Sequence, residues 1–181
     1  MAFSQSAYHT ISELTDFLLI SSAYGASSPT HLQVRGITHV INVTLNSQCA
    51  MPKYPKDITT TRIPVDDVPS AGLFNYFDKV ADMIHDVKKK GGRVLVHCWA
   101  GRSRSATLCI VYLMKYDRMT LRQAHAYVKA RRSLIRPNLG FWKQLISYEK
   151  TLFGHSSVRM VNSRIGLIPD IYEAEYKNTL W

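Results

Sequence analysis

Residues 94–105, with the sequence VLVHCWAGRSRS, constrain this chain more than any other part of it. Residues 93–96, RVLV, predict a short buried strand, and the pattern of residues 103–116 predicts a helix. A loop of five residues separates Cys98, at the end of the strand, from Arg104, at the start of the helix. The backbone N–H groups of such a tight loop, together with the helix N-terminus, form a concave site for an anion.

The polar residues of this segment suit the chemistry of phosphate. Gly101 lets the chain turn without a Cβ clash, and the planar guanidinium of Arg104 can bind two phosphate oxygens at once. A helix N-terminus and nearby cations stabilise a thiolate, so Cys98 is expected to attack phosphorus. Ser105 is placed to donate a hydrogen bond to that thiolate when it leaves. His97 should point away from Cys98 and support the loop from behind. The predicted phosphate-binding loop consists of Trp99, Ala100, Gly101, Arg102, Ser103 and Arg104.

The pattern HCxxxxxRS at residues 97–105 resembles the phosphate loop of the protein tyrosine phosphatase superfamily. The longer pattern AGxSRSA at residues 100–106 resembles the dual-specificity branch. The resemblance covers about residues 10–154, and residues 168–173 look like one subgroup of small atypical dual-specificity phosphatases. It implies hydrolysis of phosphotyrosine and of phosphoserine or phosphothreonine through a phosphocysteine intermediate. Phosphorylated proteins, MAP kinases or other signalling proteins among them, are the partners that it implies.

Family members take the proton for the leaving group from an aspartate upstream of the cysteine, in an apolar-x-Asp-x-Pro context. Residues 65–69, VDDVP, fit this context and place Asp67 at the matching position. Asp66 is the competitor, because neighbouring residues in an extended stretch point in opposite directions and only one should face the site. Asp67 is the preferred general acid.

Residues 135–141, IRPNLGF, resemble the family segment whose asparagine steadies the phosphate loop. Asn138 is therefore a candidate supporting residue, and a turn-forming asparagine after Pro137 is an equal alternative. The basic residues nearby could attract a second phosphate or acidic substrate residues, although a solvated surface is the simpler interpretation. They are Lys129, Arg131, Arg132 and Arg136.

Alternating strand and helix patterns predict an α/β fold with a central mixed, mainly parallel sheet flanked by helices, like that of protein tyrosine phosphatases. Residues 1–154 are expected to form the catalytic domain, and residues 155–181 a C-terminal tail that packs on it. Strands are expected at 16–20, 36–44, 59–65 and 93–96. Helices are expected at 31–34, 74–87, 103–116, 120–132, 139–152 and 170–175.

The composition indicates the compartment in which the protein works but does not identify its substrate. A formal net charge of +10 attracts nucleic acid, anionic membranes and phosphorylated proteins alike. Three cysteines without close pairing suit a reducing compartment, so the cytoplasm, and also the nucleus, is the expected location. A regulatory Cys49–Cys98 disulfide under oxidation is one hypothesis, and Cys109 is expected to pack in the core. Neither a transmembrane segment nor a metal or other cofactor is expected.

Three classes of function fit these features. The leading one is a dual-specificity protein phosphatase. The second is a related enzyme for a non-protein phosphate, such as a phosphoinositide or an RNA 5′ end, although nucleic acid is not the expected partner. Lipid-directed relatives tend to carry extra lysines in the loop, whereas this loop adds only Arg102. The third is a non-catalytic phospho-binding module, which would be expected to lack the nucleophile, the arginine or the acid.

Overall fold

The computed structural model describes residues 9–49 and 54–177 and contains a five-stranded sheet in the order β1-β2-β5-β3-β4. The strands are β1 (Ser12–Glu13), β2 (Leu18–Ser22), β3 (His39–Asn42), β4 (Thr59–Arg62) and β5 (Val94–Cys98). Strand β1 is antiparallel to β2, and the remaining pairs are parallel. The predicted mixed, mainly parallel sheet is thus confirmed.

The central strand β5 explains why the sheet is covered on both faces. All its residues are buried, as is usual for a parallel strand between two neighbours. Leu95 packs with Leu19 and Val40 in a small cluster on one face, whereas Val94 and Val96 belong to the large core on the other. This alternation follows from the two-residue period of a strand. The apolar residues of one short segment thereby hold two layers together.

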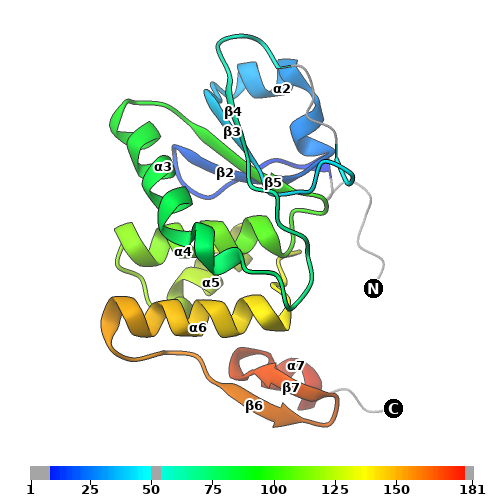
Figure 1. Ribbon diagram of the computed structural model, residues 1–181, viewed down its shortest axis with the longest axis vertical. Helices are drawn as coiled ribbons and strands as arrows, with labels where there is room; N and C mark the ends of the chain where they lie inside the picture. Colours follow the sequence, from blue (N-terminus) through cyan, green and yellow to red (C-terminus); the bar gives the residue numbers. More distant parts are fainter. Residues whose placement is uncertain (1–8, 50–53, 178–181) are drawn as a thin grey trace.

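Helices form these two layers (Figure 1). The small layer contains the 3₁₀ turn η1 (Gly25–Ser27) and helix α2 (Pro29–Val34), which covers one face of the sheet. The large layer covers the other face and contains η2 (Leu73–Tyr76), α3 (Phe77–Lys89), α4 (Arg104–Tyr116), α5 (Leu121–Arg131) and α6 (Leu139–Phe153). Helix α4 is the centre of this layer, because it contacts α3, α5, α6 and strands β2 and β5. It begins directly after the Cys98 loop.

Helix boundaries follow local capping. Thr120 caps α5: its side chain accepts a hydrogen bond from the Gln123 N–H, and the Gln123 side chain bonds back to Thr120. Asn138 caps α6 by accepting a hydrogen bond from the Phe141 N–H at 3.0 Å. The helix expected at 74–87 begins instead as the 3₁₀ turn η2. No described helix has the length and apolar character required of a membrane span.

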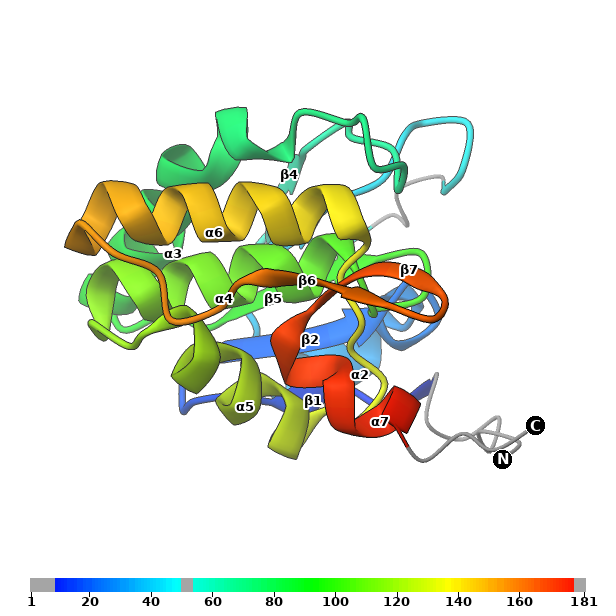
Figure 2. The same ribbon diagram turned by 90° about the horizontal axis from the view of Figure 1, so that it is seen from below.

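The segment after α6 is more regular than the sequence suggested. Strands β6 (Met160–Ser163) and β7 (Gly166–Pro169) form an antiparallel hairpin, followed by η3 (Asp170–Tyr172) and α7 (Glu173–Lys177). Figures 1 and 2 show this unit below α6, and β7 contacts that helix. Its charged anchors are an Arg122–Asp170 ion pair at 2.8 Å and an Arg136–Glu175 ion pair at 2.9 Å. The division of the chain at residue 154 stays a prediction.

Candidate active site

Cys98 ends strand β5 beneath the loop that leads into α4. Its side chain is 1% exposed, and its Sγ lies 3.2 Å from the Oγ of Ser105 in the first turn of the helix. Gly101 has a φ of +65° at the tightest point of the loop. A Cβ on Gly101 would lie 2.4 Å from the carbonyl oxygen of Ser21, so only glycine lets the loop pack against β2.

The carbonyl groups of loop residues 99–103 all have partners outside or behind the loop. The Ala23 N–H donates to the Trp99 oxygen at 3.0 Å, and the Arg136 N–H donates to the Arg102 oxygen at 2.8 Å. The Arg132 side chain donates to the oxygens of Ala100 and Gly101, and the Thr107 N–H donates to that of Ser103. The N–H groups of residues 99–103 have no acceptor in the described part of the chain. They remain available for an anion.

The N-terminus of α4 has the same property, because Ser103 occupies the cap position without capping the helix. Its hydroxyl instead donates to Oδ1 of Asp67 at 2.7 Å and accepts a hydrogen bond from the Asn138 N–H at 3.1 Å. One hydroxyl therefore joins the loop to two other segments. The uncapped N–H groups at the start of the helix carry partial positive charge toward the Cys98 site.

The two candidate aspartates point to different partners. Asp67 accepts hydrogen bonds from Ser103 and, at 2.8 Å, from the Asn138 side chain, and its Oδ2 lies 3.7 Å from Nε of Arg104. Asp66 accepts hydrogen bonds from the N–H of Asp67 at 2.8 Å and from Gln48 at 2.5 Å. These two bonds lower the pKa of Asp66, which favours its ionised form. Only Asp67 faces the phosphate-binding loop.

Gly140 fixes the backbone that carries these aspartates. It lies in the first turn of α6, where a Cβ would fall only 1.8 Å from the carbonyl oxygen of Pro69. Residues 65–69, which carry both aspartates and are called the acid segment, therefore pack backbone to backbone against the helix, two residues after Asp67. This contact holds the acid segment at a short distance from the helix that Asn138 caps.

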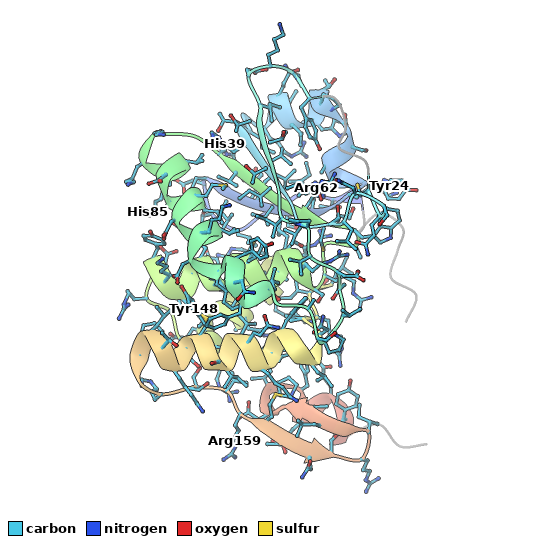
Figure 3. All side chains as sticks on the ribbon, viewed as in Figure 1. Tyr24, His39, Arg62, His85, Tyr148 and Arg159 are labelled. Atoms are coloured by element: carbon cyan, nitrogen blue, oxygen red, sulfur yellow. The ribbon has the colours of Figure 1, made fainter. Side chains whose placement is uncertain are left out.

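Arg104 is buried and lies under the acid segment. Its Nη1 donates to Oε1 of Gln48 at 2.6 Å and to the carbonyl oxygen of Val65 at 3.0 Å. Gln48 comes from the loop after β3. Arg62 of β4, which is labelled in Figure 3, holds this loop by donating to the carbonyl oxygens of Leu45 and Cys49. The role of Gln48 was not predictable, because nothing in a loop sequence shows which residue will reach across the sheet.

The basic residues near Asn138 do not form a common anion site. Arg132 is only 3% exposed, so it is not part of a solvated surface. Its guanidinium donates hydrogen bonds to loop carbonyl oxygens and to the Thr10 oxygen rather than facing the pocket. Lys129 donates to the oxygen of Ile135, and Arg131 lies over the ring of Tyr127. Arg136 pairs with Glu175. Arg132 therefore supports the phosphate-binding loop from behind.

The other predicted residues are placed as follows. Asn138 caps α6 and also bonds to Asp67, so both interpretations of this residue describe contacts that exist. His97 is fully buried, with Nδ1 3.4 Å from the Cys98 carbonyl oxygen. Trp99 is 55% exposed at the loop, and Cys109 is completely buried in the core. Cys98 and Cys109 are free thiols, and the oxidative Cys49–Cys98 bond stays a prediction.

Two buried histidines should make stability depend on pH. Burial lowers the pKa of His97 and of His125 to about 4, from an ordinary value of 6.5. The unfolded chain then binds more protons than the folded chain between these values, so stability is lost as the pH falls through this window. We expect the free energy of unfolding in urea to fall by roughly 2 kcal/mol per histidine between pH 7 and pH 5.

The His125→Gln variant is the control for this pH dependence. Its unfolding free energy should fall about half as steeply over the same range, because one of the two titrating groups is gone. A wild-type stability that is flat from pH 7 to pH 5 would show that these imidazoles are not held neutral by burial.

Chemically, the site combines a buried thiol, an arginine, a carboxylate and a cradle of N–H groups. No three His, Cys, Asp or Glu side chains within residues 9–49 and 54–177 gather into a potential metal site. The thiol, the arginine, the carboxylate and the N–H groups are what nucleophilic attack on a bound phosphate requires.

Comparison with known proteins agrees with this geometry. Residues 18–151 match the family described as dual specificity phosphatase, catalytic domain. Dual specificity protein phosphatase 14 of Mus musculus is 50% identical over 94% of this chain and 84% of its own length. Dual specificity protein phosphatase 18 of Rattus norvegicus is 49% identical over 96% of this chain and 83% of its own length. The crystal structure of human DUSP28 has a TM-score of 0.74 and 33% identity, covering 78% of this chain and 94% of that one. The chain therefore belongs to the dual specificity phosphatase family, within the protein tyrosine phosphatase superfamily.

Proposed function

We propose that this protein hydrolyses phosphotyrosine and phosphoserine or phosphothreonine in proteins through a phosphocysteine intermediate. The observation that carries the proposal is the position of Cys98. Its sulfur lies beside Ser105, at the base of a loop whose carbonyls all have partners and whose N–H groups have no acceptor among residues 9–49 and 54–177. Such a cradle holds a phosphoryl group for attack by the sulfur.

In the first step, the Cys98 thiolate attacks phosphorus while the bond between phosphorus and the ester oxygen breaks. Asp67, in its protonated form, gives its proton to the leaving oxygen. Arg104 and the loop N–H groups stabilise the charge on the equatorial oxygens. Arg104 Nη1 already donates to Gln48 and Val65, whereas its buried Nε has no hydrogen-bond partner in the described part of the chain and can donate to a phosphate oxygen.

In the second step, water attacks the phosphocysteine and Asp67 accepts the proton from that water. The sulfur–phosphorus bond breaks and Cys98 leaves as a thiolate. The Ser105 hydroxyl, 3.2 Å from the sulfur, is close enough to donate a hydrogen bond to it. Inorganic phosphate is released, and the thiolate is ready for the next cycle.

The small number of cations in the loop favours a protein substrate over a phosphoinositide. Arg102 is the only extra cation in the loop, and its Nε donates to the carbonyl oxygen of Leu134 at 3.2 Å. This bond directs part of its guanidinium toward the protein rather than toward a second phosphate. MAP kinases and other signalling proteins are the candidate substrates, and the cytoplasm and nucleus the proposed locations.

A panel of phosphate donors tests the proposal. Wild-type protein should release phosphate from phosphotyrosine and phosphothreonine peptides, and much more slowly from soluble phosphoinositides and from RNA with a 5′ triphosphate. Phosphate release at equal substrate concentration is the measurement. Faster release from the lipid or the RNA would move the function to a non-protein phosphate. Peptide binding without any release would indicate a phospho-binding module.

A further inference from the structure

A groove of about 380 Å³ lies beside the active site, between α6, the acid segment and the C-terminal hairpin. We call it the hairpin groove. Its walls include Pro69 of the acid segment, the cap residue Asn138 and Leu139 at the start of α6, Ile165 and Leu167 of the hairpin, and Tyr172. The volume lies at the small end of the range of protein binding pockets, about 300–1,000 Å³. It suits one or two side chains rather than a whole protein surface.

The hairpin groove is continuous with the catalytic residues. Asn138 lines the groove, while its side chain donates to Asp67 at 2.8 Å and its backbone N–H donates to Ser103 of the phosphate-binding loop at 3.1 Å. Pro69, which also lines the groove, follows Asp67 by two residues. An extended peptide advances about 3.3 Å per residue, so positions a few residues from the phosphorylated one would reach this groove.

The chemistry of the groove is apolar. Ile165 is 55% exposed and Leu139 is 42% exposed, which places two of the large exposed apolar side chains on its walls. The cation in its lining is already neutralised, since Arg136 pairs with Glu175 at 2.9 Å and lies 4.5 Å from the centre of the Tyr172 ring. A second phosphate would therefore find no free positive charge from Arg136. An apolar side chain would cover Ile165 and Leu139 and remove them from water.

From these contacts we propose that the hairpin groove binds an apolar side chain of the substrate polypeptide, a few residues from the phosphorylated residue. The proposal rests on the proposed function, since it concerns which phosphoproteins that site accepts. The C-terminal hairpin thereby becomes a specificity element of the enzyme. Figure 2 shows the hairpin reaching toward the same end of the molecule as the start of α6.

The test uses a phosphotyrosine peptide of small neutral residues and derivatives with one leucine, one to four residues before or after the phosphotyrosine. For the wild-type protein, kcat/KM should rise roughly tenfold for the leucine position that reaches the groove. In the Ile165→Asp variant this preference should disappear. Leu139→Ser should weaken it as well, and provides a second probe from the other wall.

Two controls separate docking from damage. Val34→Asp, on an 81% exposed side chain of α2 across the sheet, should keep the leucine preference. Hydrolysis of a small aryl phosphate, which cannot reach the groove, should be the same in wild type, Ile165→Asp and Val34→Asp. A fall in aryl phosphate turnover in Ile165→Asp alone would assign the hairpin to the catalytic site and overturn the docking role.

The other outcomes are equally distinct. Aryl phosphate turnover with no leucine preference in the wild type would overturn the groove proposal and leave the proposed function standing. Absence of aryl phosphate turnover would instead overturn the proposed function. A dimer in sedimentation velocity that Ile165→Asp dissociates would assign the groove to a second copy of the chain and overturn the substrate role.

Discussion

Replacement of Cys98 by serine should reduce hydrolysis of an aryl phosphate below detection. The serine hydroxyl is a far weaker nucleophile than a thiolate, and the N–H cradle does not ionise it. Serine is close to cysteine in size, so the loop and its bonds to Ala23, Arg132 and Arg136 should persist. Phosphate release in a continuous assay measures the loss.

Binding distinguishes this loss from unfolding. The Cys98→Ser protein should still gain thermal stability from a phosphate analogue such as tungstate, because Arg104 and the loop N–H groups bind the anion independently of the sulfur. Cys49→Ser is the matched control, since it makes the same change in the loop after β3 and should keep full turnover. Turnover retained in Cys98→Ser would exclude the phosphocysteine mechanism.

Replacement of Asp67 by asparagine should lower kcat by about 10²–10⁴-fold on a phosphotyrosine peptide, which is the usual contribution of a positioned general acid. Asparagine keeps the shape of the side chain and can still bond to Ser103 and Asn138. The loss should shrink on an aryl phosphate whose phenol is strongly acidic, because that leaving group needs little protonation. The kcat values of both substrates are the measurement.

The matched control is Asp66→Asn, one residue away on the same segment. Asp66 bonds to Gln48 and to the Asp67 N–H rather than to the phosphate-binding loop, so its loss should be small and should not depend on the leaving group. A larger effect of Asp66→Asn would transfer the acid role to that residue. An equal effect of Asp67→Asn on both substrates would make Asp67 a positioning residue.

The fold class was predictable because its signals are local. The apolar run before Cys98 and the helical period after Arg104 place a strand and a helix in one short segment, and the structure agrees with both. The helix expected at 120–132 agrees with α5 for the same reason. The hairpin at 160–169 was not, because its strands are four residues long and only partly buried. Strands that short carry little alternation of apolar and polar residues.

The residues of the active site likewise fall into those that the sequence predicts and those that it does not. Cys98, Arg104 and Ser105 lie in one continuous motif, so their proximity could be predicted from spacing alone. Gln48 and Arg132 come from distant segments, and their contacts depend on how the loops cross the end of the sheet. The charge of Arg132 suggested a surface residue, whereas the loop carbonyls that it satisfies make its burial tolerable. No pattern in the sequence encodes such a match.

The close contact between Gly140 and Pro69 makes residue 140 a position at which the rate of turnover can be changed. Any side chain at residue 140 must push the acid segment outward, while the sulfur, the arginine and the carboxylate all keep their chemical identity. A substitution at residue 140 should therefore change the rate of turnover without replacing any of the reacting groups. A slow form built there would hold a bound phosphoprotein for longer, with the whole catalytic apparatus still in place.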